Sequence, residues 1–109
     1  TMCAALMFAG FEPLQAADGA EGIKILKSSK ADVVIVDIFM PGKEGFETIG
    51  EIKATLPDVK ILAISGGGGS WRDSIDVATM SKDLGADDYL AKPFRNEQLV
   101  AKVLGLLAE

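Results

Sequence analysis

Apolar residues occur along this chain in two patterns, continuous runs and a helical spacing. Val33–Val36 is a continuous run of β-branched residues, and Val59–Ile64 is apolar except at Lys60. Such runs are typical of strands buried on both faces of a parallel sheet. Between these runs, Phe46, Ile49 and Ile52 recur at the spacing of one helix face. The alternation of the two patterns predicts βαβ units, with helices on both faces of one parallel sheet.

Glycine and proline mark the ends of several predicted elements. Gly10 and Gly85 follow predicted helices as C-caps, and Pro57 stops another. The predicted helices cover Met2–Phe8, Ala20–Ser28, Glu44–Leu56, Ser70–Leu84 and Arg95–Ala108. The predicted strands cover Phe11–Ala16, Ala31–Val36, Val59–Ile64 and Asp87–Ala91. Strands and helices therefore alternate through the chain, as a doubly wound α/β fold requires.

Length and composition narrow the function. The 109 residues are expected to form one domain, and a net charge of −5 without a basic run argues against direct nucleic-acid binding. Thr1–Gly10 is apolar but too short to span a bilayer, so no membrane association is expected. Cys3 is the sole cysteine, which excludes an internal disulfide and favours a reducing compartment, the cytoplasm. The chain has no histidine, which excludes Ser-His-Asp and Cys-His catalysis.

Polar residues follow three of the predicted strands. Asp37, Ser65 and Lys92 each come directly after an apolar strand, and the carboxyl ends of parallel strands meet at one edge of the sheet. A carboxylate, a hydroxyl and an ammonium at one edge suit a phosphoryl group. The carboxylate can accept it as an acyl phosphate, while the hydroxyl and the lysine contact its oxygens.

Each of these residues has a simpler interpretation when it is taken alone. Asp37 could cap the turn that Pro41 and Gly42 impose. Ser65 could simply begin the glycine-rich loop Gly66–Gly69, for which both a flexible flap and a solvated linker remain open. Lys92, before Pro93, could be a solvated loop charge. Their joint occurrence at three strand ends favours a functional site.

Several segments together resemble the receiver domain of response regulators, in the CheY-like superfamily. They are Ala17-Asp18-Gly19 (ADG), Val33–Gly42 (VVIVDIFMPG), Ile64-Ser65-Gly66 and Gly85–Phe94 (GADDYLAKPF). They occur in the order and spacing of that family and extend over nearly the whole chain. Any one of them would be a weak signal, whereas the combination is highly specific.

The resemblance implies a role for each site residue. Asp37 corresponds to the phospho-acceptor, Ser65 to the switch hydroxyl, Lys92 to the phosphate-binding lysine and Tyr89 to the switch aromatic residue. It also implies a Mg²⁺ site that includes the carboxylate of Asp37 and the backbone carbonyl of Phe39. The family fold is flavodoxin-like, with strand order 2-1-3-4-5.

The sequence departs from the family at its beginning. Receiver domains start with a strand followed by an acidic pair that holds Mg²⁺, and this sequence starts in what corresponds to the first helix. We therefore expect an N-terminally incomplete receiver domain, with the first strand missing and weak Mg²⁺ binding. Asp18, Asp87 and Asp88 are assigned to a helix cap and to the start of a strand rather than to the metal.

The expected function is that of a phospho-accepting switch in a two-component phosphorelay. The implied partners are a histidine kinase or histidine phosphotransfer protein and an output protein, and dimerisation is left open. No enzymatic activity is expected beyond phosphoryl transfer to the chain itself and autodephosphorylation. The alternative is a pseudo-receiver that binds partners without phosphorylation. An aspartyl phosphatase of the haloacid dehalogenase type is disfavoured, because Phe39 stands where its second Asp would be.

Overall fold

The structure is a computed structural model that describes residues 2–11, 19–29, 31–37, 44–65, 79–91 and 94–108. Its elements are α1 (Met2–Phe8), α2 (Gly19–Ser28), β1 (Val33–Asp37), α3 (Glu44–Thr55), β2 (Lys60–Ser65), β3 (Asp88–Ala91) and α5 (Asn96–Leu107). Residues 79–84 are also helical and coincide with the end of the predicted helix Ser70–Leu84. The predicted strand Phe11–Ala16 lies outside the described residues except at Phe11. The other predicted elements agree with the structure to within two residues at each end.

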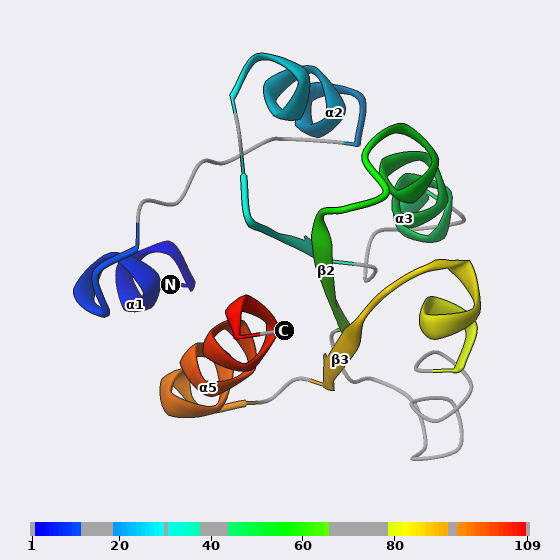
Figure 1. Ribbon diagram of the computed structural model, residues 1–109. Coiled ribbons are helices and arrows are strands. Elements are labelled where there is room, and N and C mark those ends of the chain that lie inside the picture. Colours follow the sequence, from blue (N-terminus) through cyan, green and yellow to red (C-terminus); the bar gives the residue numbers. More distant parts are fainter. Residues whose placement is uncertain are drawn as a thin grey trace.

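The described strands form one parallel sheet with the order β1-β2-β3 (Figure 1). Val33 pairs with Lys60 at the start of β1, and Leu62 pairs with Asp88 at the start of β3. The predicted α/β fold with a parallel sheet is thereby confirmed. The order β1-β2-β3 corresponds to the 3-4-5 part of the predicted 2-1-3-4-5 arrangement, and the rest of that arrangement is not represented among the described residues.

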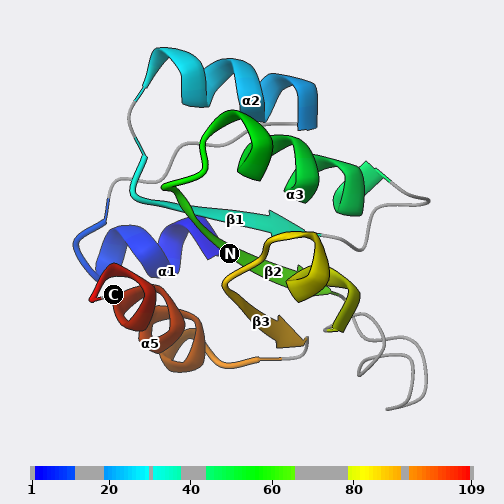
Figure 2. The ribbon, with the colours of Figure 1, turned by 45° about the vertical axis from the view of Figure 1, so that its right-hand side comes forward.

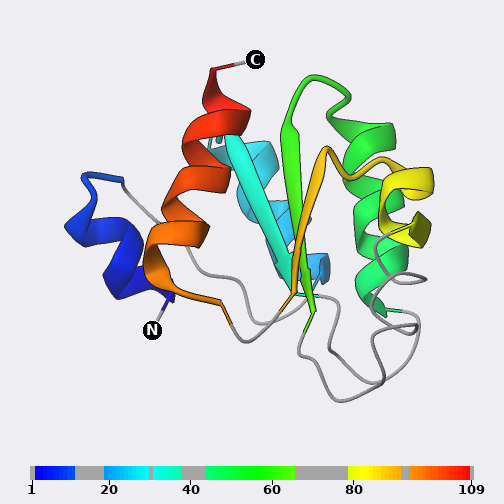
Figure 3. The same ribbon diagram turned by 90° about the horizontal axis from the view of Figure 1, so that it is seen from below.

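Helices cover both faces of the sheet (Figure 3), and a separate apolar cluster lies on each face. On one face, Ile49 and Ile52 of α3 pack with Ile61 and Ala63 of β2. On the other face, Leu6 of α1 and residues of α5 pack with Leu62 and Ile64. β2 contributes side chains to both clusters, which explains why its apolar run is continuous rather than alternating.

α5 meets the sheet through apolar residues at helical spacing. Leu99, Val103 and Leu106 of α5 are buried and follow an i, i+4, i+7 pattern. Arg95 precedes α5 in an extended conformation, and its backbone N–H donates to Oε1 of Gln98 at 2.8 Å. That bond satisfies one amide at the start of the helix. In the described part of the chain, no helix is long and apolar enough to cross a membrane.

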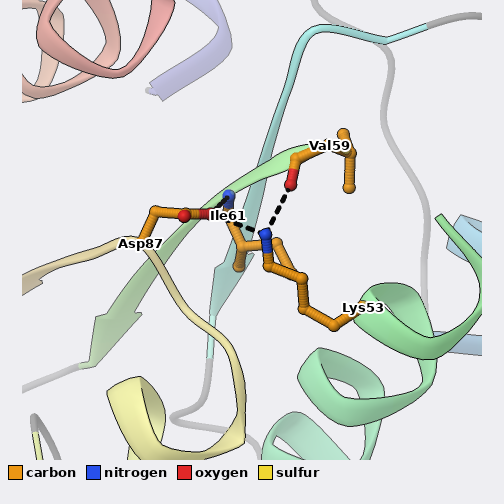
Figure 4. Close-up of polar contacts among 4 residues, drawn as sticks. All are labelled: Lys53, Val59, Ile61 and Asp87. Carbon is orange, nitrogen blue, oxygen red and sulfur yellow. Dashed lines mark hydrogen bonds and ion pairs between the residues drawn. The ribbon is translucent and has the colours of Figure 1, made fainter. Parts of the chain in front are cut away.

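A charged cluster joins α3 to the amino-terminal ends of β2 and β3 (Figure 4). Nζ of Lys53 lies 3.1 Å from Oδ2 of Asp87 and donates to the carbonyl oxygen of Val59 at 2.9 Å. Asp87 Oδ2 also accepts the backbone N–H of Ile61 at 2.8 Å, and the N–H of Asp87 donates to the carbonyl of Ile61 at the same distance. Asp87 comes directly before the first residue of β3, and its backbone and side chain continue the hydrogen bonding between β2 and β3 by one residue in that direction.

Gly85 makes room for this cluster. Its φ is +123°, a conformation that side-chain-bearing residues rarely adopt, and a Cβ atom there would clash with Cγ of Lys53. The sequence predicted Gly85 as a helix C-cap, and the residue does follow the helical residues 79–84. The structure adds a second reason for glycine, which is that the lysine stem passes directly over it.

Candidate functional site

The described strands end at one edge of the sheet (Figure 2). β1 ends with Asp37, which pairs in register with Ile64, so Ser65 of β2 extends one residue further. Ser65 in turn pairs with Ala91, the last residue of β3. The structure thus places the predicted acceptor and the predicted switch hydroxyl at the ends of neighbouring strands, as the parallel pattern required.

Ser65 and Tyr89 are in direct contact at this edge. The Oγ atom of Ser65 lies 2.5 Å from the hydroxyl oxygen of Tyr89, a short hydrogen bond in which either group could be the donor. Ser65 is buried, with 8% of its surface exposed, and Tyr89 is half-buried. A buried hydroxyl requires a partner, and Tyr89 supplies one.

The contact follows from the register of β2 and β3. Tyr89 pairs with Ala63, and side chains on a strand return to the same face every second residue, so Ser65 shares a face with Tyr89. The tyrosine ring packs against the cluster that contains Ala63, and its length carries the hydroxyl to Ser65. The sequence indicated Ser65 by its place at a strand end and Tyr89 by the family resemblance alone, and the sheet register brings the two together.

Asp88 and Asp87 already have structural partners. Oδ1 of Asp88 accepts the backbone N–H of Tyr89 at 2.8 Å and lies 3.1 Å from Nζ of Lys102 on α5. Asp87 belongs to the charged cluster with Lys53 at the other end of the sheet. Both carboxylates thus take part in contacts within the protein, and their assignment as structural rather than metal-binding residues stays a prediction.

Two residues of the predicted site fall outside the described part of the structure, namely Lys92, the predicted phosphate-binding lysine, and Phe39, whose carbonyl was predicted to bind metal. Asp18, the predicted helix cap, lies outside it as well. The loop Gly66–Gly69 is outside it as well. The roles assigned to these residues stay predictions.

The described residues do not by themselves form a magnesium site. They contain no group of three or more histidine, cysteine, aspartate or glutamate side chains that could hold a metal ion. Mg²⁺ requires near-octahedral oxygen coordination, and Asp37 is the predicted ligand that the structure describes. The donor set that the structure describes therefore falls short of what this cation needs.

The parallel sheet between two helical layers, with an aspartate and a hydroxyl at its carboxyl edge, defines a receiver-type α/β domain. Comparison with known proteins identifies its family, because residues 2–104 match the response regulator receiver domain. The chain belongs to this family. Such domains are regulatory domains of two-component signalling rather than conventional enzymes. Response regulators interact with histidine kinases and output domains, and their receiver domains generally bind Mg²⁺ at an acidic pocket.

Individual relatives agree with this assignment. The response regulator MprA of Mycolicibacterium vanbaalenii is 36% identical over 102 residues, which are 94% of this chain and 42% of that protein. The chain thus spans about two fifths of the length of such relatives. The receiver domain of NtrX from Brucella abortus superposes with a TM-score of 0.87 at 26% identity, covering 98% of this chain and 87% of that one.

A third similar structure is a response regulator from Burkholderia pseudomallei, which contains a phosphorylated aspartic acid, a calcium ion and citrate. It superposes with a TM-score of 0.77 at 29% identity, covering 92% of this chain and 56% of that one. The phosphorylated aspartic acid, the calcium ion and the citrate are properties of that protein.

Proposed function

We propose that this domain is a switch that accepts a phosphoryl group on Asp37. A carboxylate oxygen of Asp37 attacks the phosphorus of a phosphohistidine, an acyl phosphate forms, and the phosphorus–nitrogen bond of the donor breaks. The observation that carries the proposal is the position of Asp37 at the end of β1, beside β2, whose last residue Ser65 is hydrogen-bonded to Tyr89 of β3. The phosphorylated aspartate of the Burkholderia pseudomallei relative supports the same chemistry.

The Ser65–Tyr89 hydrogen bond suggests how phosphorylation is sensed. A hydroxyl has one donor hydrogen and two acceptor lone pairs, so Ser65 can donate to a phosphoryl oxygen while it accepts from Tyr89. If Ser65 donates to Tyr89 before phosphorylation, the direction of their bond reverses afterwards. The two residues then act as one unit that links the acceptor strand to β3.

Lys92 is proposed to pair with a second phosphoryl oxygen as a point charge, on the strength of the resemblance alone. Mg²⁺ is the proposed cofactor, with Asp37 and the carbonyl of Phe39 as ligands and with weak affinity. The proposed donor is a cytoplasmic histidine kinase or a histidine phosphotransfer protein. The signal passes to an output protein, without direct contact of this domain with nucleic acid or membrane.

A second candidate is a pseudo-receiver that binds partners without phosphorylation. The observation in its favour is that the described residues lack a group of three metal-ligating side chains. The two candidates differ in one measurable property, which is whether Asp37 becomes phosphorylated.

The test is incubation of the purified protein with acetyl phosphate and Mg²⁺, followed by intact-mass spectrometry. We expect one added phosphoryl group, and we expect Asp37→Asn to remove it, because an amide of nearly the same shape cannot form the acyl phosphate. Asp32→Asn is the matched control, since Asp32 is exposed and precedes the amino-terminal end of β1. Unchanged labelling of Asp37→Asn would refute the acceptor assignment, and no labelling of the wild type would favour the pseudo-receiver.

A further inference from the structure

The ammonium group of Lys53 joins the beginnings of two neighbouring strands (Figure 4). It donates to the carbonyl oxygen of Val59, the residue directly before β2. It also forms an ion pair with Asp87, the residue directly before β3. A single side chain of α3 therefore sets where β3 begins relative to β2.

The turn that leads into β3 is held by the same side chain. The stem of Lys53 occupies the space in which a Cβ atom of Gly85 would lie, and Gly85 has the positive φ that turns the chain there. The next residue, Ala86, is buried. The carboxylate of Asp87 accepts the N–H of Ile61, and the N–H of Asp87 donates to the carbonyl of the same residue. Sliding of β3 along β2 at this end would break several of these contacts at once.

The position of the Tyr89 hydroxyl depends on this alignment. Tyr89 lies two residues after Asp87 and pairs with Ala63, and its hydroxyl oxygen lies 2.5 Å from Oγ of Ser65. Hydrogen bonds between hydroxyl groups span about 2.5–3.0 Å, so a displacement of roughly half an ångström weakens the contact. A slip of one residue would carry the ring to the opposite face of the sheet. The start of β3 thus decides whether the two hydroxyls meet.

The strand between the two ends of the sheet is tightly packed. Ser65 lies four residues after Ile61, which is about 13 Å at the rise of a parallel strand. All residues of this segment are buried, and apolar clusters pack on both of its faces. Close-packed interiors transmit strain rather than absorb it. A change in the contacts of Lys53 is therefore expected to reach the Ser65–Tyr89 pair through β2 and β3 themselves.

We propose that Lys53 is a positioning residue for the switch. It acts through Asp87 to align β3 on β2, and this alignment holds the hydroxyl of Tyr89 within bonding distance of Ser65. The contacts of Lys53 lie at the opposite end of the sheet from Asp37, so it takes no part in the phosphoryl transfer itself. The inference deepens the switch proposed above and rests on it, but the alignment can be measured without phosphorylation.

NMR of the tyrosine ring tests the alignment directly. Tyr89 is the only tyrosine of the chain, so ring-labelled tyrosine gives one set of signals, all from the switch residue. The wild type and Ser65→Ala define the ring shifts with and without the hydrogen bond between the hydroxyls. Lys53→Met should move the signals at least about a third of the way toward those of Ser65→Ala, because a looser alignment populates conformations without the bond. Lys53→Arg should restore most of the wild-type position, since it returns a charged donor to Asp87.

A second variant tests the partner of Lys53. Asp87→Asn keeps a carbonyl oxygen for the N–H of Ile61 but loses the charge that pairs with Lys53. It should shift the Tyr89 signals in the same direction as Lys53→Met. The double variant should add little to either single change, because both remove the same interaction.

Leu6→Ala is the matched control for a general loss of stability. It removes a buried side chain from the cluster on the other face of the sheet, where α1 packs on α5. Its thermal unfolding temperature should fall at least as far as that of Lys53→Met. The Tyr89 signals should nevertheless stay within about a tenth of the difference between wild type and Ser65→Ala, because the alignment of β3 on β2 is intact.

Beryllofluoride extends the test to the switch. It should shift the Tyr89 signals of the wild type, and in Lys53→Met this shift should fall to less than about half, because fewer molecules hold the hydroxyl pair. Unchanged ring signals in Lys53→Met and Asp87→Asn would overturn the inference, as would an equal shift in Leu6→Ala. Absence of acetyl-phosphate labelling in the wild type would instead refute the switch proposed above, and the ring signals recorded without beryllofluoride would still decide whether Lys53 positions Tyr89.

Discussion

The two ends of the sheet carry polar clusters of opposite character. At the amino-terminal end, Lys53 and Asp87 form an ion pair that also takes up backbone groups of Val59 and Ile61. At the carboxyl-terminal end, the hydroxyls of Ser65 and Tyr89 share a single hydrogen bond. The first cluster holds three segments of the chain together through several contacts, whereas the second joins two strands through one.

The difference between the two clusters suits the proposed switch, in which the carboxyl-terminal end of the sheet responds to phosphorylation. The side chains of Lys53 and Asp87 are 23% and 22% exposed, so removing either partner leaves a poorly solvated charge or backbone group behind. The Ser65–Tyr89 bond joins neutral groups, and Ser65 can rearrange it while it keeps a partner. In the proposed switch, the amino-terminal cluster holds the end of the sheet that stays fixed, and the Ser65–Tyr89 pair lies at the end that changes.

The largest expected effect belongs to Gly85→Ala. An alanine must adopt a φ of +123°, and its Cβ clashes with Cγ of Lys53, so the free energy of unfolding should fall by about 2–4 kcal/mol. Urea denaturation measures the change. Gly50→Ala is the control, because a Cβ at this helical glycine of α3 meets no atom within 4 Å. It should be neutral or stabilising by about 0.5–1 kcal/mol. Similar losses for both variants would contradict the close contact between Gly85 and the side chain of Lys53.

An intermediate effect is expected for Lys53→Met. This substitution keeps most of the stem but removes the ion pair with Asp87 and the hydrogen bond to the carbonyl of Val59. The free energy of unfolding should fall by about 1–2 kcal/mol. Lys24→Met, on the exposed surface of α2, should change it by less than about 0.5 kcal/mol. If the two lysines proved equivalent, the amino-terminal cluster would contribute no more than a surface charge.

The smallest effect on stability is expected for Tyr89→Phe, together with a distinct effect on signalling. Loss of the hydroxyl removes one neutral hydrogen bond, which should cost about 0.5–1.5 kcal/mol. Labelling by acetyl phosphate should persist, because Asp37 is intact. In NMR spectra, beryllofluoride should shift amides of both β2 and β3 in the wild type, and the shifts in β3 should shrink in the variant. Wild-type shifts that never reach Tyr89 would disprove the proposed coupling.

Much of the architecture was predictable because it depends on local patterns. The continuous apolar runs identified β1 and β2, since strands covered on both faces carry apolar side chains on both faces. The periodic helices α3 and α5 began and ended within two residues of prediction. Asp37 and Ser65 could be assigned to one edge because parallel strands place their carboxyl ends together.

Lys53 is the residue that sequence reasoning missed. In the sequence it is a lysine in the last turn of a helix, where basic residues are common and usually solvated. Its partner Asp87 lies 34 positions further along the chain, and nothing local connects them. Gly85 offered a partial signal, yet a glycine after a helix is fully explained as a C-cap.

The sequence by itself determined the fold class, the family resemblance and the edge at which the chemistry was expected. These follow from periodicity and from motifs that are contiguous in the chain. The tertiary structure alone decided that Tyr89 bonds to Ser65, that Lys53 ties α3 to Asp87, and that Phe8 and Leu104 remain exposed. Such contacts depend on strand register and helix packing between distant segments, where a shift of one residue moves a side chain to the other face.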